Sequence, residues 1–377
     1  MTVLAPAYQG TATAGEPPPG SQVVHEIPDA DAISAEIDRV VGEVQDLQAS
    51  KSQPAAGVPG ADQQVENIFR CAEFMETARY CLGYGWTTST EDAVQAELQA
   101  AVVTESARRS AAEETGDLSL QEMIDHASTM SLDERASTDR RELEDAAAGI
   151  EKFVQLEELR LSANPVSIDA PAGSVGARAV IGGHTYPESG GILQGRVSEQ
   201  ETTYWCGPTT LQMMAWNYGS HAKVAQSTWA TRLNTTTAGT AITDMVRVIN
   251  NNGQLSKWVT QQDSNYVTLN IGSYTYAQWY QLNVNHYSTW STPVVLHPIL
   301  LKKYYPYLDD NGSGHFQLGR GWDFESHKTD SWQLKYYEPW NQQRFNPSEP
   351  FIPRKQKRWA KNSYLANKEH FQHNIGV

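Results

Sequence analysis

The residue with the clearest potential for chemistry is Cys206, which stands in a Tyr-Trp-Cys-Gly-Pro run directly before an apolar helical pattern. Leu211, Met214, Ala215 and Tyr218 are spaced to form one face of a helix, so we predict a helix that begins close to Cys206. The free N–H groups and the dipole of a helix N-terminus stabilise negative charge, so the pKa of the Cys206 thiol is expected to be lowered. A thiolate is the nucleophile that acyl transfer requires, whereas a lone cysteine without such neighbours is usually an inert apolar residue.

Gln200 lies six residues before Cys206 and offers a second group for the same chemistry. Its side-chain amide can fold back and donate a hydrogen bond to an oxyanion, and the backbone N–H of Cys206 would be the second donor. We therefore predict that Gln200 and the start of the helix face one reacting carbonyl.

Gln200, the Tyr-Trp-Cys-Gly-Pro run and the following helix resemble the C39-like family of papain-fold cysteine peptidases. The resemblance covers roughly residues 190–345. It implies an α+β, papain-like fold in which an N-terminal helix carries the cysteine and an antiparallel sheet carries a histidine. It also implies a Cys-His-Asp/Asn triad that hydrolyses peptide bonds, often after small residues such as a double glycine.

The resemblance also assigns the remaining roles. The family carries its general base in a Gly-His pair at the start of a strand, which corresponds to His315 in this sequence. It places an Asp followed by Pro at the end of the return strand, where this sequence has Glu338 before a proline. A Glu carboxylate can orient an imidazole as Asp does, with one more methylene in its side chain. Asn341 and Asp323 are the alternative third members.

Local patterns predict the elements that must position these residues. A turn-rich loop at 309–314 leads into the strand that His315 opens, and 332–341 is expected to pair with it as the return strand. Further strands are predicted at 266–271 and 293–297, and a helix at 276–287.

Charge divides the chain of 377 residues into two halves. Residues 1–180 hold 31 acidic and 12 basic residues, a net charge of −19, whereas residues 181–377 carry +4. Ten of the eleven tryptophans lie at or after position 205, so the packed catalytic body is expected there. The net acidity argues against nucleic acid as a partner, and no apolar run of about 18 residues could span a membrane. We expect a peptide or protein substrate, with no cofactor and no metal.

We predict five segments from composition and periodicity. They are a disordered tail at 1–28, an acidic helical region at 29–161, a linker at 162–195, a papain-like catalytic domain at 196–345 and a C-terminal extension at 346–377 packed on the body. The helical region would be a regulatory, propeptide-like cover of the active site or a structural, partner-binding bundle. Its acidic helices could dock on the basic C-terminal extension.

Cys71 and Cys81 are the other two cysteines. Three cysteines make neither a disulfide framework nor a metal cluster. On one helix the pair would lie about 15 Å apart, too far for a disulfide, so two free thiols are expected. The first residues lack the basic and apolar regions of a signal peptide, which favours the cytoplasm over secretion.

Two other functions fit the same residues. An amine could capture the Cys206 thioester, giving a transglutaminase-like or peptide-ligating acyltransferase, if aromatic residues exclude water from the site. The candidates for such a wall are Trp205, Trp216, Trp322 and Trp340. Alternatively, the fold could serve as a non-catalytic peptide- or partner-binding module. The positions of Glu338 and Gln200 relative to His315 and Cys206 discriminate between enzyme and binding module.

Overall fold

The computed structural model describes residues 26–51, 61–109, 112–162, 178–181, 184–193, 195–218, 222–253, 255, 265–324 and 331–377. The architecture is α+β, and none of the described helices is long and apolar enough to cross a membrane. The helices are α1 (Ala30–Lys51), α2 (Ala61–Ile68), α3 (Glu91–Arg109), α4 (Leu120–Thr129), α5 (Leu132–Ala148), α6 (Ile150–Leu161), α7 (Cys206–Asn217), α8 (Gln226–Arg232), α9 (Ile242–Asn251), α11 (Tyr276–Asn285), the π-helical η1 (His286–Trp290), α12 (Gln342–Phe345) and α13 (Ala360–Glu369). The strands are β1 (Cys71–Met75), β2 (Ala78–Cys81), β3 (Gly85–Thr87), β4 (Arg178–Ile181), β5 (His184–Pro187), β6 (Ser189–Gly191), β7 (Thr268–Asn270), β8 (Val294–Leu296), β9 (Gln317–Asp323), β10 (Gln333–Tyr337), β11 (Lys355–Trp359) and β12 (Asn374–Gly376).

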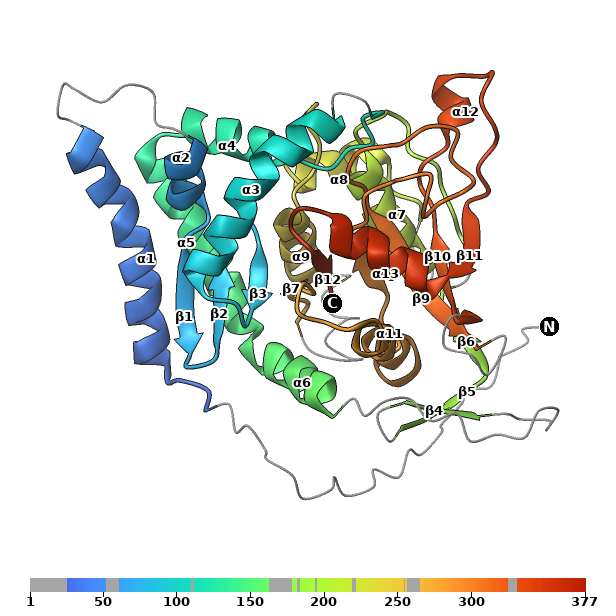
Figure 1. Cartoon of the computed structure of the whole chain (residues 1–377), viewed down its shortest axis with the longest axis horizontal. Helices are drawn as coiled ribbons and strands as arrows, with labels where there is room; N and C mark the ends of the chain where they lie inside the picture. Colours follow the sequence, from blue (N-terminus) through green and yellow to red (C-terminus); the bar gives the residue numbers. More distant parts are fainter. Residues whose placement is uncertain are drawn as a thin grey trace.

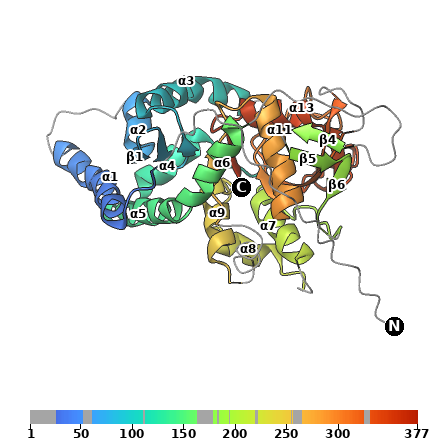
Figure 2. The same cartoon turned by 90° about the horizontal axis from the view of Figure 1, so that it is seen from below.

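Ten of these strands form one sheet, which is largely antiparallel, in the order β1-β2-β3-β7-β12-β8-β9-β10-β11 with β6 paired to β9. β3 and β7 pair in parallel through Trp86 and Leu269, so the sheet continues from the acidic half into the half that carries Cys206 (Figure 1). Figure 2 shows α1–α5 grouped at one end of the molecule and β4–β6 at the other. One sheet therefore joins segments that we predicted to be separate, namely a helical region, a linker and a catalytic domain.

The acidic region is mostly helical, as predicted, but its residues 71–87 form β1, β2 and β3, where we predicted helix followed by a turn. All four residues of β2 and all three of β3 are buried, so these strands show no apolar–polar alternation. Short buried strands without alternation cannot be distinguished from buried helix by periodicity alone. The predicted linker likewise contains β4, β5 and β6. Residues 182–183 of the predicted linker and the predicted tail up to residue 25 lie outside the described residues.

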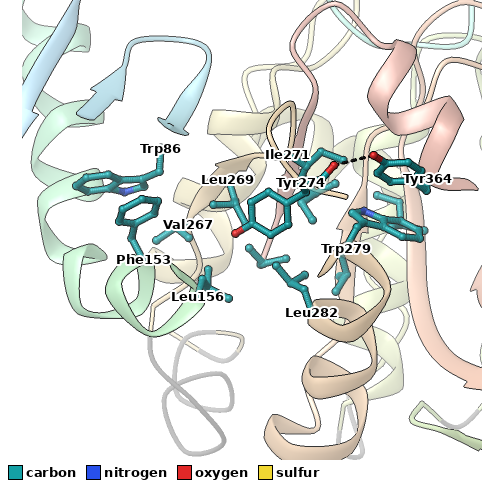
Figure 3. Packing of buried hydrophobic residues seen from close by; sticks show 14 of the residues in the cluster. Trp86, Phe153, Leu156, Val267, Leu269, Ile271, Tyr274, Trp279, Leu282 and Tyr364 are labelled. Carbon is teal, nitrogen blue, oxygen red and sulfur yellow. Dashed lines mark hydrogen bonds between the residues drawn. The ribbon is translucent and has the colours of Figure 1, made fainter. Parts of the chain in front are cut away.

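A continuous apolar core explains why the two halves fold together. The Trp86 ring of β3 stacks on Phe153 of α6 with ring centroids 4.6 Å apart. Leu269 pairs with Trp86 across the sheet, and Tyr274 extends the same buried cluster toward Trp279 of α11 (Figure 3). Aromatic side chains bury large apolar areas, so this cluster stabilises the contact between the acidic half and the rest of the sheet.

The C-terminal residues are part of the sheet, which differs from the predicted extension on its surface. β12 lies between β7 and β8, and the last residue, Val377, is buried. Two of the basic side chains also pair within the body, Arg354 with Glu199 at 2.8 Å and Lys357 with Asp323 at 2.9 Å. β12 must therefore be in place before the central part of the sheet is complete.

Cys71 and Cys81 form a disulfide, so the prediction of two free thiols is wrong. They face each other across the β1–β2 hairpin, with Cα atoms 3.9 Å apart. The prediction failed because it placed both cysteines on one helix, where the rise per residue would separate them. Disulfides are typical of proteins in oxidising compartments.

Reduction of this disulfide is expected to lower the free energy of unfolding by about 2.5 kcal/mol, because a cross-link over a short loop restricts the unfolded chain. Urea-induced unfolding with and without dithiothreitol measures the difference. The matched control is the double variant Cys71→Ser/Cys81→Ser, whose unfolding midpoint should not respond to the reductant. An equal response in the control would show that the reductant does not act through this disulfide.

Candidate active site

Cys206 opens α7, as the apolar periodicity predicts. Its side chain is fully buried, and the backbone N–H groups of Phe316 and Gly207 donate hydrogen bonds to Sγ. Thr210, one turn later, donates its hydroxyl to the carbonyl oxygen of Phe316 at 3.2 Å. These contacts hold the first turn of α7 against the segment that leads into β9. They also bring His315, the residue before Phe316, to the start of the helix.

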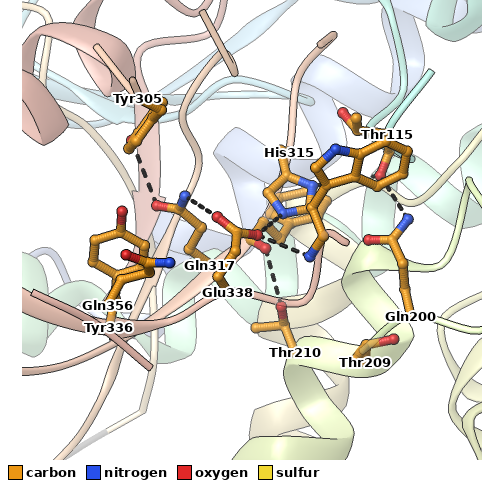
Figure 4. Close-up of polar contacts among 12 residues, drawn as sticks. Thr115, Gln200, Thr209, Thr210, Tyr305, His315, Gln317, Tyr336, Glu338 and Gln356 are labelled. Atoms are coloured by element: carbon orange, nitrogen blue, oxygen red, sulfur yellow. Dashed lines mark hydrogen bonds and ion pairs between the residues drawn. The ribbon is translucent and has the colours of Figure 1, made fainter. Parts of the chain in front are cut away.

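His315 and Glu338 form a fully buried pair next to this helix start (Figure 4). Nε2 of His315 lies 2.8 Å from Oε1 of Glu338. Glu338 directly follows β10, which pairs with β9 in antiparallel register, so the sheet itself sets the distance between the two side chains. With Nε2 turned to the carboxylate, Nδ1 is the ring nitrogen that can exchange a proton with a reacting group.

Four donors surround the carboxylate of Glu338. Besides His315, the backbone N–H of Trp340 donates to Oε1 at 2.9 Å, and Tyr307 Oη and Gln317 Nε2 each donate to Oε2 at 2.7 Å. Burial alone would raise the pKa of Glu338, but His315 and these hydrogen bonds outweigh burial and lower the pKa. The carboxylate therefore stays ionised and fixes the orientation of the imidazole.

The two alternative third members lie elsewhere. Asn341 donates to Glu199 at 2.8 Å and accepts from the backbone N–H of Ile352. Asp323 pairs with Lys357 at 2.9 Å at the end of β9. The structure thus brings Glu338, and neither Asn341 nor Asp323, to the imidazole of His315.

Gln200 reaches the same site from the segment before α7. Its backbone N–H donates to the carbonyl of Pro339, the residue after Glu338, at 2.9 Å. Its side-chain Nε2 lies 2.8 Å from the carbonyl oxygen of Thr203 and 3.0 Å from that of Thr202. These two carbonyl oxygens hold the Gln200 amide at the site. A third carbonyl oxygen comes from the acidic half of the chain.

That additional oxygen is the backbone carbonyl of Thr115. It lies 3.4 Å from Nε2 of Gln200 and 3.4 Å from Nδ1 of His315. Among the described residues, no hydrogen bond joins Sγ of Cys206 to His315. The predicted oxyanion donor and the predicted base thus both face a backbone oxygen of the same chain.

The pKa of the Cys206 thiol is raised, whereas we predicted from the sequence that it would be lowered. Burial raises the pKa of the thiol well above its ordinary value, and the nearby carboxylate of Asp117 adds to this effect. The hydrogen bond from the Phe316 N–H lowers the pKa but does not compensate. The helix N-terminus was the only influence visible in the sequence, because Asp117 belongs to a distant segment.

Sequence reasoning missed three residues of this site, Thr115, Tyr307 and Gln317. Gln317 could have been found, because it lies two residues after His315 and residues two apart share one face of an extended chain. Thr115 carries no local signal, since it contributes a backbone carbonyl and lies 200 residues from His315 in the sequence.

A second buried cluster lies nearby and joins Asp117, His297 and His370, whose candidate ligand atoms are within 4.8 Å of one another. Oδ2 of Asp117 lies 2.8 Å from Nε2 of His370, and Oδ1 lies 2.9 Å from Nε2 of His297. Nδ1 of His370 accepts a hydrogen bond from the backbone N–H of Gln372 at 3.3 Å, so the ring proton of neutral His370 resides on Nε2. A metal would need the lone pair of that nitrogen, so the cluster fits a hydrogen-bonded carboxylate better than a metal centre.

In comparisons with known proteins, no family model, no curated protein and no solved structure matches the chain.

Proposed function

We propose that this protein is a cysteine peptidase with a papain-like, C39-like catalytic domain, in which Cys206 is the nucleophile. The observation that carries the proposal is the buried His315–Glu338 pair beside the start of α7. A nucleophile, a base held by a carboxylate and an amide donor are the groups that acyl transfer requires. Gln200 supplies the amide donor.

In the first step, Nδ1 of His315 takes the proton of Cys206 and Sγ attacks the carbonyl carbon of a peptide bond. The carbonyl oxygen becomes an oxyanion, which Nε2 of Gln200 and the backbone N–H of Cys206 stabilise. Glu338 stabilises the imidazolium that forms, through the hydrogen bond to Nε2.

In the second step, His315 returns its proton to the leaving amine, the C–N bond breaks and a thioester remains on Cys206. Water then attacks the thioester while His315 accepts its proton. The products are a new carboxylate, a new amine and the regenerated thiol.

We favour hydrolysis over transfer to an amine because only two of the four tryptophans of the suggested aromatic wall lie at the site, Trp205 directly before Cys206 and Trp340 next to Glu338. Trp322 donates to the carbonyl of Pro187 next to β6. Trp216 lies near the C-terminal end of α7 and contacts the ammonium group of Lys223. Neither ring is placed to exclude water from a thioester at the first residue of α7.

The proposal is tested by incubating the full chain with a mixture of tryptic peptides in H₂¹⁸O and identifying new termini by mass spectrometry. Wild type is compared with Cys206→Ser, and both are repeated with Gly116→Ala, a change intended to displace Thr115 from the site. We expect ¹⁸O in new carboxyl termini only when Cys206 is present. Amine addition in place of ¹⁸O would indicate an acyltransferase, and no Cys206-dependent product in either background would indicate a binding module.

A further inference from the structure

Residues 113–118, between α3 and α4, cross the candidate active site with a bend at Gly116 and pair with the body on both sides. On one side, the N–H of Glu113 donates to Asn311 O at 2.9 Å and its carbonyl accepts from Ser313 N–H at 2.8 Å. On the other side, Thr240 N–H donates to Gly116 O at 3.0 Å, and Asp117 forms a parallel bridge with Thr240. Peptide ligands of many proteins bind in this way, through main-chain hydrogen bonds to an exposed edge.

The middle of this segment lies on the proposed catalytic groups. The carbonyl oxygen of Thr115 faces both the Gln200 amide and Nδ1 of His315 (Figure 4). The side chain of Thr115 is also bound, since its hydroxyl donates to Gly314 O at 2.8 Å. A substrate carbonyl would need the same position to receive a hydrogen bond from Gln200.

Gly116 fits where a larger residue could not. Its φ is +110°, and a Cβ atom built on it would lie 2.7 Å from the backbone carbonyl carbon of Tyr204. Gly239 faces it from the other wall, where a Cβ would meet Gly116 O. The segment is therefore closely packed between the segment before α7 and the loop before α9.

Asp117 anchors the segment to the sheet. Its carboxylate is buried between His370, at 2.8 Å, and His297, at 2.9 Å. His297 follows β8 and its Nδ1 lies 2.7 Å from Oδ1 of Asn374, the first residue of β12. The contact thus joins the crossing segment to the two central strands of the sheet, although more than 170 residues separate Asp117 from either histidine in the sequence.

We propose that residues 113–118 occupy the peptide-binding groove of this enzyme as an internal pseudosubstrate and keep it latent until they are displaced. This inference rests on the proposed peptidase function. It assigns the groove between Asn311–Gly314 and Thr240 to an extended peptide that pairs through its backbone.

The state of the thiol supports this assignment. Burial raises the pKa of the Cys206 thiol, and the segment adds to this effect through the carboxylates of Asp117 and Glu114. Displacement of the segment would hydrate Sγ and remove these charges, leaving the helix N-terminus to stabilise the thiolate.

The test uses two variants of the full chain that weaken the segment by different means. Gly116→Ala forces a Cβ toward the backbone of Tyr204, and Asp117→Asn removes the charge but keeps the shape. The matched controls are Gly42→Ala, whose Cβ would meet nothing within 4 Å, and Asp125→Asn, an exposed carboxylate on α4. Circular dichroism and thermal unfolding establish whether each variant is folded.

The readout is the rate at which iodoacetamide alkylates Cys206 at pH 7, followed by mass spectrometry. We expect alkylation to be about 10- to 100-fold faster in Gly116→Ala and Asp117→Asn than in wild type, because loss of a buried charged hydrogen bond shifts a local opening by about that factor. The controls should match wild type. A synthetic peptide with the sequence of residues 112–119 should slow the alkylation of both variants.

Equal rates in all proteins would overturn the proposal, and so would loss of cooperative unfolding in both variants, which would make the segment part of the core. Alkylation does not require turnover, so it separates this inference from the peptidase assignment. Faster alkylation of the two variants without hydrolysis of any peptide would support the inference that residues 113–118 cover the Cys206 thiol. The same result would contradict the proposed peptidase function.

Discussion

Replacement of Glu338 by Gln is expected to lower kcat/KM for peptide hydrolysis by a factor on the order of 10³–10⁴, the loss typical of removing the orienting carboxylate of a triad. The carboxylate accepts from His315 and Trp340 at one oxygen and from Tyr307 and Gln317 at the other. A glutamine amide has only one oxygen, so its NH₂ group must face donors on one side.

The consequence for the imidazole depends on which way the amide turns. If the NH₂ group faces His315, Nε2 becomes an acceptor, the ring proton moves to Nδ1 and His315 can no longer accept the proton of Cys206. If the oxygen faces His315, the NH₂ group meets Tyr307 and Gln317, which leaves buried donors unsatisfied. The first arrangement removes the reactive tautomer, whereas the second retains it only at the cost of these unsatisfied donors.

Asp323→Asn and Asn341→Ala serve as controls because both residues lie away from His315. Asp323→Asn removes only a partly exposed ion pair. We therefore expect its kcat/KM to stay within about twofold of the value for the same protein without this substitution. Measurements are made in parallel in the wild-type and Gly116→Ala backgrounds, so that a covered site does not hide the effect. A normal rate for Glu338→Gln together with a large loss for Asn341→Ala would assign the third position to Asn341.

Acidification from pH 7.5 to pH 4.5 is expected to destabilise the fold through His370 by about 2–3 kcal/mol, the free energy of protonating a buried imidazole. Burial lowers the pKa of His370 to about 4, and His297 and His373 add repulsion that Asp117 only partly offsets. The folded state therefore favours the neutral ring, whereas the unfolded chain takes up a proton below its ordinary pKa of 6.5. This stabilisation is complete above that pH and declines as the pH falls toward 4.

Measurement of this effect requires a difference between two proteins, because other groups titrate in the same range. Burial raises the pKa of Glu142 to about 7, and its protonation stabilises the fold on acidification, with the opposite sign. Urea unfolding of wild type and His370→Asn at several pH values removes this shared contribution. Wild type should lose more stability than the variant below pH 6.5. Parallel curves would show that His370 takes up its proton without opening its contact with Asp117.

The helix that begins at Cys206 and the main strands around His315 were predictable because their signals are local. The apolar spacing from Leu211 onward specifies one buried helix face wherever the helix is placed. The β9 and β10 strands follow from a turn between two runs of strand-forming residues, and the structure confirms both. These patterns were sufficient to predict an α+β fold with Cys206 and His315 on different elements.

Only the tertiary structure decided which distant groups meet these residues. The choice of Glu338 over Asn341 and Asp323 depends on the register of β9 and β10, which places one of three polar side chains on the imidazole. The Cys71–Cys81 disulfide and the central position of β12 depend on pairing between strands too short and too buried to show alternation. Thr115 acts through a backbone carbonyl that every residue possesses, so its contact with His315 is set by the path of the chain and not by its residue type.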